Sequence, residues 1–171
     1  MQKDWESSVY VEAPVEKVFA YLADVSRHPE WDASVAKVER ISDGLGGDAG
    51  SEWKVYERLN VLQGKGESRW NSAGIAHREL REVVPHSRVS WQTHPVPAVG
   101  ISAVFAWDLE PEGSGTRVTQ RVRLTVPGLV HKVGKLVARK LDENQMGLWE
   151  RNLQNLKAVA EGASVPNLAV V

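Results

Sequence analysis

Apolar and polar positions along the chain change their spacing several times, and each spacing predicts a different element. Residues 5–12 roughly alternate and are rich in β-branched and aromatic types, which predicts a first strand. After Pro14, apolar residues recur at helical spacing as far as Leu22, so a short helix follows. Ser26 can then cap a second short helical turn that ends near Trp31.

Strand-like patterns dominate the middle of the chain. Glycine and proline punctuate them, as expected for the turns of antiparallel hairpins. The six predicted strands cover residues 35–41, 51–59, 75–84, 87–94, 101–110 and 116–126. Between the second and third of these, residues 60–74 are polar and contain glycine, which predicts a long loop or an irregular hairpin.

From Leu129 the apolar spacing becomes helical again and stays so for about 30 residues, which predicts one long amphipathic helix. Residues 162–171 have no such pattern and form an expected flexible tail behind a domain of residues 1–161. Successive strands with short connections make an antiparallel sheet. Because one helix covers only one face, a sheet of six to seven strands must curve around it. The expected fold is therefore α+β, a helix-grip with two short helices after the first strand and a cavity between sheet and helix.

Composition narrows the function classes. The 171 residues carry a formal net charge of -1 and no basic stripe, so nucleic acid is not an expected partner. The absence of cysteine removes disulfides, thiolate nucleophiles and cysteine-based zinc sites, and it fits a reducing compartment. No stretch approaches the roughly 20 apolar residues of a membrane span, and the N-terminus lacks the apolar core of a signal peptide. We therefore expect a cytoplasmic protein with no integral membrane segment.

Sequence motifs do not indicate a cofactor or a metal. Residues 44–49, GLGGDA, match the spacing of a dinucleotide fingerprint, but that site needs a helix after the glycines and a strand follows here. A hairpin turn explains the segment better. The five histidines lack any close metal-binding spacing, so we expect no metal.

Three segments together resemble the START-like (SRPBCC) superfamily, which contains polyketide cyclases/dehydrases and birch-allergen-like proteins. They are APVEKVFAYLADVSRHPEW, ELREVVPHSRVSW and WDLEPEGSGTRVTQ. The first carries the family's strand, helix and Pro-x-Trp turn, at Pro14, Val18, Phe19, Pro29 and Trp31. The resemblance covers about residues 5–160 and implies the helix-grip fold. Members bind lipids, sterols, polyketides, quinones or plant hormones, and some are aromatase/cyclases, so the fold alone leaves the function open.

Strand alternation selects the residues that would line the cavity. If Leu109 points inward, then Phe105 and Trp107 share its face, and the same reasoning places Trp91 with Val89 and Trp53 with Val55. Seven tryptophans beside two phenylalanines favour a flat or ring-containing ligand, although plain core packing is the competing interpretation. The expected ligand-binding residues are Trp31, Trp53, Trp91, Phe105, Trp107, Gln120, Val137 and Leu141.

Polar residues near the predicted cavity offer weaker candidates for catalysis. A cyclase of this superfamily would need a buried arginine to polarise a ligand carbonyl, with an acid or base beside it. Arg69, His77 and Glu79 are the candidates, and Arg78, Gln92 and Gln120 could orient a ligand. A shift of one residue in the register would turn these side chains to the other face of the sheet.

Three functions remain in competition. The leading hypothesis is binding of a small hydrophobic or aromatic molecule, such as a lipid or a polyketide, in the internal cavity. The alternative is a polyketide aromatase/cyclase or dehydrase that uses acid–base chemistry in the same space. A stress or regulatory module that acts through its surface is the third, and a homodimer is considered for each.

Overall fold

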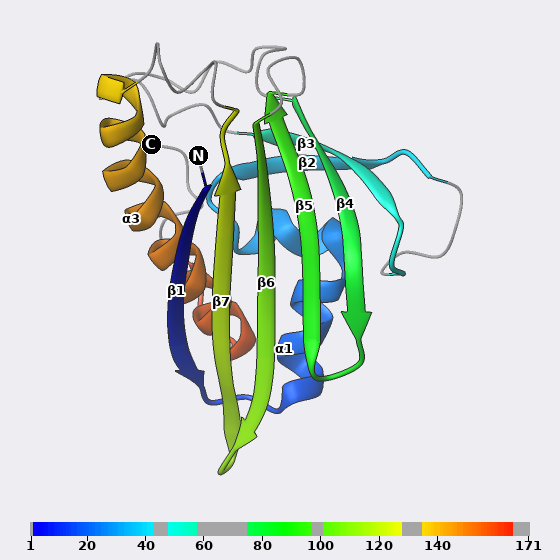
Figure 1. Ribbon diagram of the computed structural model, residues 1–171. Helices are drawn as coiled ribbons and strands as arrows, with labels where there is room; N and C mark the ends of the chain where they lie inside the picture. Colours follow the sequence, from blue (N-terminus) through cyan, green and yellow to red (C-terminus); the bar gives the residue numbers. More distant parts are fainter. Residues whose placement is uncertain (1, 43–47, 58–74, 97–100, 128–134, 166–171) are drawn as a thin grey trace.

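One antiparallel sheet of seven strands organises the fold, with helices on one of its faces (Figure 1). The computed structural model describes residues 2–42, 48–57, 75–96, 101–127 and 135–165. The strands are β1 (Gln2–Val11), β2 (Val35–Arg40), β3 (Glu52–Glu57), β4 (Ile75–Val84), β5 (Arg88–Val96), β6 (Ile101–Glu112) and β7 (Gly115–Thr125). The helices are α1 (Val15–Ala23), the 3-10 helix η1 (Val25–Glu30) and α3 (Lys135–Ala160).

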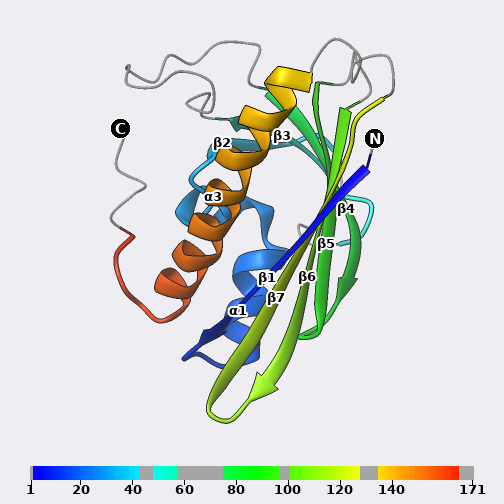
Figure 2. The same cartoon turned by 60° about the vertical axis from the view of Figure 1, so that its left-hand side comes forward.

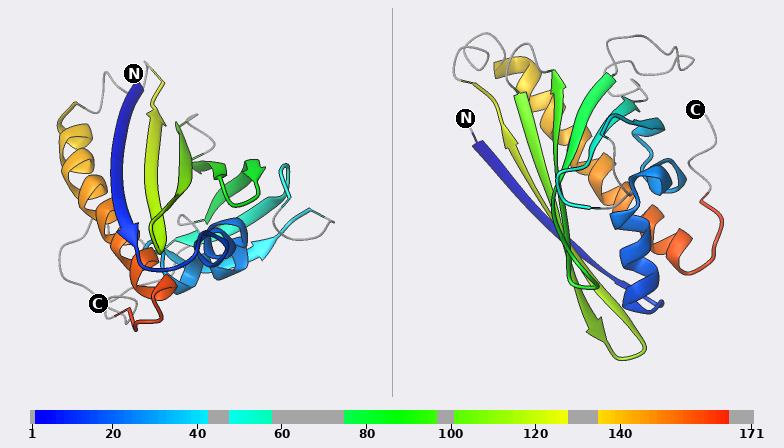
Figure 3. Two further views of the ribbon diagram at one scale, coloured as in Figure 1. Left: turned by 90° about the horizontal axis from the view of Figure 1, so that it is seen from below. Right: turned by 90° about the vertical axis from the view of Figure 1, so that its right-hand side faces the viewer.

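The strand order is β1-β7-β6-β5-β4-β3-β2, so β1 and β2 form the two edges. Only β1 lies beside a strand that is distant in the sequence, since the other neighbours follow one another along the chain. The sheet curves around α3, while α1 and η1 cover one end of the same face (Figures 2 and 3). The predicted α+β helix-grip fold is confirmed.

The core lies between the concave face of the sheet and the helices. Alternate residues of β7 supply its wall, because Val118 and Val122 point inward. From the helical layer, Leu22 of α1 and Leu156 of α3 are fully buried against this wall. Trp31, directly after η1, is also buried, so the turn that follows the short helices belongs to the core.

A chain of ion pairs crosses the convex face of the sheet. Asp108 on β6 stands at its centre and accepts hydrogen bonds from Arg88 on β5 and Arg121 on β7. The Nε atom of Arg121 donates to Glu6 on β1 and that of Arg88 donates to Glu82 on β4, each at 2.7 Å. The network joins five neighbouring strands, although each pair is partly exposed and contributes modestly.

The last turn of α3 is attached to the end of β1. Lys157 donates to the carbonyl oxygen of Tyr10 at 2.9 Å and to Glu161 at 2.5 Å. Glu161 accepts in turn from the backbone N–H of Glu12 at 2.7 Å. The Lys157 ammonium, together with this N–H, lowers the pKa of Glu161 below its usual value. These bonds fix where α3 ends relative to the edge of the sheet.

Two boundaries differ from the expected ones. β1 begins at Gln2 rather than at residue 5, because its first residues pair with β7 and Arg123 donates to Asp4 at 2.7 Å. The second short helix is capped by Asp24, whose carboxylate accepts from the Ser26 N–H at 3.0 Å, and not by Ser26 itself. The expected loop at 60–74 lies entirely outside the described residues, as do most of the turn at 44–49 and most of the tail.

Gly115 and Gly147 should respond in opposite ways to replacement by alanine. A Cβ atom on Gly115 would collide with the carbonyl oxygen of Val11 and the ring of Tyr10, so Gly115→Ala should lower the free energy of unfolding by about 2 kcal/mol. A Cβ atom on Gly147, within α3, meets nothing within 4 Å, so Gly147→Ala should raise it by about 1 kcal/mol. Urea unfolding measures both changes. Equal effects of the two substitutions would contradict the close approach at Gly115.

Candidate functional site

Two neighbouring rows of side chains cross the concave face of the sheet. In the first row, Trp5, Val122, Phe105 and Trp91 lie opposite one another on β1, β7, β6 and β5. The Trp91 ring stacks on Phe105 with centroids 5.9 Å apart and a 24° interplanar angle. This row makes a continuous apolar and largely aromatic wall.

The second row contains groups that can form hydrogen bonds. Gln120 on β7 lies opposite Ser7 on β1 and Trp107 on β6. The Trp107 indole stacks on Trp91 at 5.8 Å, which joins the two rows, and its edge meets Trp31 at 5.4 Å. Gln120 is only 3% exposed, so its polar amide is placed well inside the concave face.

Trp149 of α3 closes the space above these rows. Its ring meets Trp5 edge-on at 4.9 Å and Phe105 at 5.9 Å. A recess of about 30 Å³ remains between helix and sheet. Its walls are Trp5, Glu6, Ser7, Gln120, Val122, Trp149 and Glu150.

A wider, open groove of about 510 Å³ adjoins the recess along the edge strand β1. It is lined by Ser7, Ser8, Gly147, Glu150, Arg151, Leu153 and Gln154. Ser7 and Glu150 border both hollows, so the recess opens into the groove. The groove therefore leads to the recess from the side of the sheet, between β1 and α3.

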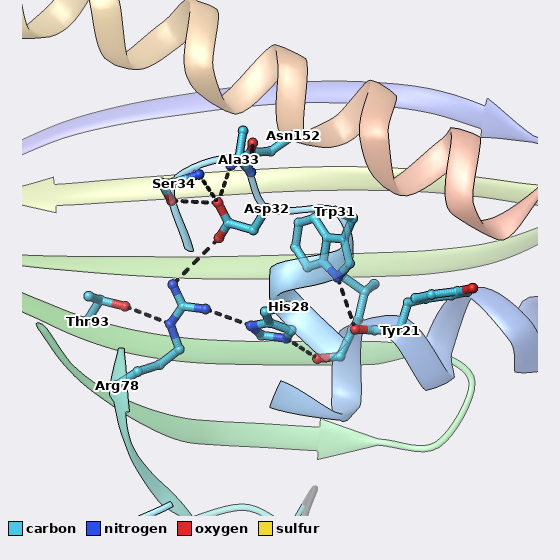
Figure 4. A network of polar contacts seen from close by, with 10 residues as sticks. Tyr21, His28, Trp31, Asp32, Ala33, Ser34, Arg78, Thr93 and Asn152 are labelled. Carbon is cyan, nitrogen blue, oxygen red and sulfur yellow. Dashed lines mark hydrogen bonds and ion pairs between the residues drawn. The ribbon is translucent and has the colours of Figure 1, made fainter. Parts of the chain in front are cut away.

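A buried polar network around Arg78 joins β4, the turn after η1 and α3 (Figure 4). Arg78 of β4 is 3% exposed, and its partners include His28, Thr93 and Asp32. Its Nη1 lies 2.6 Å from Nδ1 of His28, its Nε donates to Thr93 at 3.3 Å, and its Nη2 lies 3.7 Å from the Asp32 carboxylate. The charge of Arg78 is thus compensated by Asp32 inside the core.

Asp32 also joins the turn after η1 to α3. Its Oδ1 accepts from the N–H and hydroxyl of Ser34 and, at 2.7 Å, from the side-chain amide of Asn152. Asn152 returns a contact to the turn by accepting from the Ala33 N–H at 2.9 Å. Three parts of the fold, β4, the turn and α3, therefore share one set of hydrogen bonds.

The contacts of His28 determine its protonation. Nε2 lies 3.0 Å from the carbonyl oxygen of Leu22, which can only accept, so Nε2 carries the proton and Nδ1 accepts from Arg78. Burial, reinforced by the Arg78 charge, lowers the pKa of His28 from 6.5 to about 3. The imidazole is neutral near pH 7 and serves as a fixed hydrogen-bond partner.

Among the expected ligand-binding residues that the structure describes, Gln120 borders the recess and four aromatic residues cluster beside it. Trp31, Trp91 and Trp107 form the buried ring cluster with the half-buried Phe105, and Gln120 lines the recess. Trp53 is buried farther along the sheet on β3, and its indole N–H donates to Ser51 at 3.3 Å. A ligand contact for each of these side chains stays a prediction.

The candidates for catalysis on β4 require a correction. Ala76, Arg78 and Leu80 point inward, so His77 and Glu79 lie on the convex face, away from the hollow. His77 lies 3.5 Å from Glu52 there, and Glu79 accepts from Arg81 at 3.0 Å. Gln92, opposite Glu79 on β5, shares that outer face. The inward-facing polar residue of this strand is Arg78.

Three expected site residues cannot be placed. Arg69 lies outside the described residues, and the side chains of Val137 and Leu141 lie outside the described part of α3.

The sequence interpretation missed Trp5 and Trp149, and both had a signal. Trp5 precedes Ser7 and Val9 at alternate positions of β1 and therefore shares their face. Trp149 lies four and seven residues before Leu153 and Leu156, at the spacing of a single helix face.

Two features are absent from the described residues. Among the described residues, no three histidine, aspartate or glutamate side chains group as metal ligands would. Within the same ranges, no helix has the length and apolar character required to cross a membrane.

Removing the charge of Arg78 should destabilise the protein by leaving Asp32 buried without compensation. We expect Arg78→Met to lower the free energy of unfolding by about 3–5 kcal/mol. The double variant Arg78→Met/Asp32→Asn should recover part of that loss, because an asparagine side chain can still accept from Ser34 and Asn152. Urea unfolding of both variants measures how strongly the effects of Arg78 and Asp32 on stability depend on each other. If the double variant is no more stable than the single one, Asp32 is not the charge that Arg78 compensates.

The neutral state of His28 predicts how stability depends on pH. The folded-state pKa of about 3 lies below the ordinary value of 6.5, so between these values the unfolded chain binds a proton that the folded chain does not. Stability should therefore fall as the pH falls from 6.5 toward 3, by up to about 1.4 kcal/mol per pH unit from this group. The side chain in His28→Gln keeps one donor and one acceptor but does not titrate. The stability of this variant should therefore fall less steeply with pH, by up to about 1.4 kcal/mol per pH unit. Parallel stability curves for the two proteins would refute the assignment.

Comparison with known proteins places this geometry in a family. The family described as "Polyketide cyclase / dehydrase and lipid transport" matches residues 2–161. A search of curated protein sequences gives no significant match.

Solved structures show the same fold at low sequence identity. The aromatase/cyclase ZhuI from Streptomyces sp. R1128 is 16% identical with a TM-score of 0.63, over 96% of this chain and 100% of that one. Major latex-like protein 151 from Panax ginseng is 12% identical with a TM-score of 0.64, over 93% and 97%. The two-domain aromatase/cyclase StfQ of the steffimycin pathway is 18% identical with a TM-score of 0.67, over 95% of this chain and 52% of that one. With a family match that spans nearly its whole length, this chain belongs to the polyketide cyclase/dehydrase and lipid transport family.

Proposed function

We propose that this protein binds a small hydrophobic, ring-containing molecule in the hollow between β1, β7 and α3. The observation that carries the proposal is the recess between Trp5, Val122 and Trp149, where the aromatic wall of the concave face reaches an opening. Aromatic walls favour flat, ring-bearing ligands, because stacked and edge-on ring pairs contribute beyond the burial of area. Family membership supports a role in ligand binding or polyketide cyclisation in general terms.

Entry of a ring requires Trp149 to move. The recess of about 30 Å³ has room for roughly two water molecules, which is too little for an aromatic ring. The groove beside it is far larger and open. A bound ligand therefore lies partly in the groove. Its ring replaces Trp149 in the edge-on contact with Trp5.

Binding explains the described polar groups better than acid–base chemistry does. Arg78, the buried cation that a cyclase mechanism would use, is engaged by Asp32, His28 and Thr93. At the rim of the recess, Glu6 is mostly exposed and paired with Arg121. The cyclase alternative therefore requires a polarising group other than Arg78.

Ethylbenzene tests the proposal as a single-ring probe. It should bind with a dissociation constant on the order of 1 mM, as expected for a fragment of this size. The tryptophan indole N–H signals report where it binds, and those of Trp5 and Trp149 should shift most in a proton–nitrogen correlation titration. Ser7→Phe places a ring in the recess and should weaken binding at least about tenfold.

The matched control is Thr119→Phe, which adds the same ring to the outer face of β7, next to the residue that lines the recess. This variant should bind ethylbenzene as the unmodified protein does. If Ser7→Phe and Thr119→Phe bind equally, or if the shifts appear away from Trp5 and Trp149, the hollow is not the binding site. Native mass spectrometry of the purified protein provides an independent search for a bound small molecule.

A further inference from the structure

The side chain of Gln120 has hydrogen-bonding capacity that the described residues do not use. The residue is 3% exposed, it borders the recess, and no hydrogen bond joins its side-chain amide to another described residue. The Gln120 amide is not among the fully buried side-chain atoms that lack a partner in the described residues, so it faces the recess. If a bound molecule covers the amide without forming a hydrogen bond to it, the cost is about 1–3 kcal/mol. An arrangement of this kind persists when water or a ligand supplies the missing partner.

The neighbours of Gln120 strengthen this observation. The buried indole N–H of Trp107, directly opposite on β6, also lacks a partner within the described part of the chain. The Ser7 hydroxyl, opposite on β1, lines the same recess. Of these groups, Gln120 and Ser7 face the recess, and the Trp107 indole lies beside Gln120 in the same row behind the recess wall.

We infer that Gln120 is the specificity-determining residue of the hollow and that it selects ring-bearing molecules with a carbonyl or hydroxyl oxygen. The inference rests on the proposed function and adds the chemistry of the ligand. The ring lies against the apolar row of Trp5 and Val122, and its oxygen points to the polar row, where the Gln120 amide donates to it. A hydroxyl group can in addition donate to the amide oxygen of Gln120.

The discrimination follows from desolvation. In the free protein, the recess has room for roughly two waters that can satisfy Gln120. A pure hydrocarbon expels this water and leaves the amide unsatisfied, whereas a ketone replaces the lost hydrogen bond. The oxygen therefore decides between two ligands of nearly equal shape.

Acetophenone carries a carbonyl oxygen that ethylbenzene lacks, and the two molecules have nearly the same shape. Both are titrated and followed by the tryptophan indole N–H signals. The unmodified protein should bind acetophenone about tenfold more tightly than ethylbenzene. Gln120→Leu should bind the two probes within about twofold of each other, mainly because it loses affinity for the ketone. The control, Gln92→Leu, makes the same substitution on the convex face and should keep the tenfold preference.

The side-chain amide signals of Gln120 give a reading that does not depend on a folded variant. In the unmodified protein they should shift with acetophenone and stay nearly still with ethylbenzene. Equal affinity for the two probes, or unshifted Gln120 signals, would overturn the role of Gln120 and leave the proposed function intact. If neither probe binds at millimolar concentration, the proposed function fails and this inference fails with it.

Discussion

A single buried positive charge determines how the layers of this protein meet. Arg78 projects from β4 into the core, where an isolated guanidinium would be strongly disfavoured, and it is held there by Asp32, His28 and Thr93. Asp32 in turn binds Asn152, so satisfying the charge also joins the turn after η1 to α3. Apolar contacts alone are non-directional, and this network gives the packing of helix on sheet a defined position.

Two parts of α3 have different contacts: one part is held by hydrogen bonds to the turn and to β1, and the other borders the hollow. Asn152 and Asn155 hold the helix to the turn, since Asn155 donates to the carbonyl oxygen of Trp31 at 3.0 Å, while Lys157 holds it to β1. Trp149 and Glu150, one turn earlier, face the recess and the groove. The anchored part of the helix therefore positions the part that borders the recess and the groove.

The fold was predictable because its period-2 and period-3.6 patterns are clear, and the inner faces of β5 and β6 followed from Val89 and Leu109. The site was predictable only in part. On β4, one face carries Ile75, His77 and Glu79 and the other carries Ala76, Arg78 and Leu80, so polarity does not separate them. Charged side chains usually face solvent, but Arg78 points inward. A bulge between Leu80 and Glu82 also interrupts the alternation of faces along β4. The partners of Arg78 are 46 and 50 residues earlier in the chain, at Asp32 and His28, a separation that no local pattern reveals.

The separation of the ionic network from the row of Ser7, Gln120 and Trp107 has an evolutionary consequence. Under the proposed function, substitutions at Gln120 or Ser7 would alter which molecules the hollow accepts, and they would leave the contacts of Arg78 with Asp32 unchanged. With that function, ligand preference would diverge through a few inward positions of β1 and β7, while the ionic network that joins helix, turn and sheet stays the same.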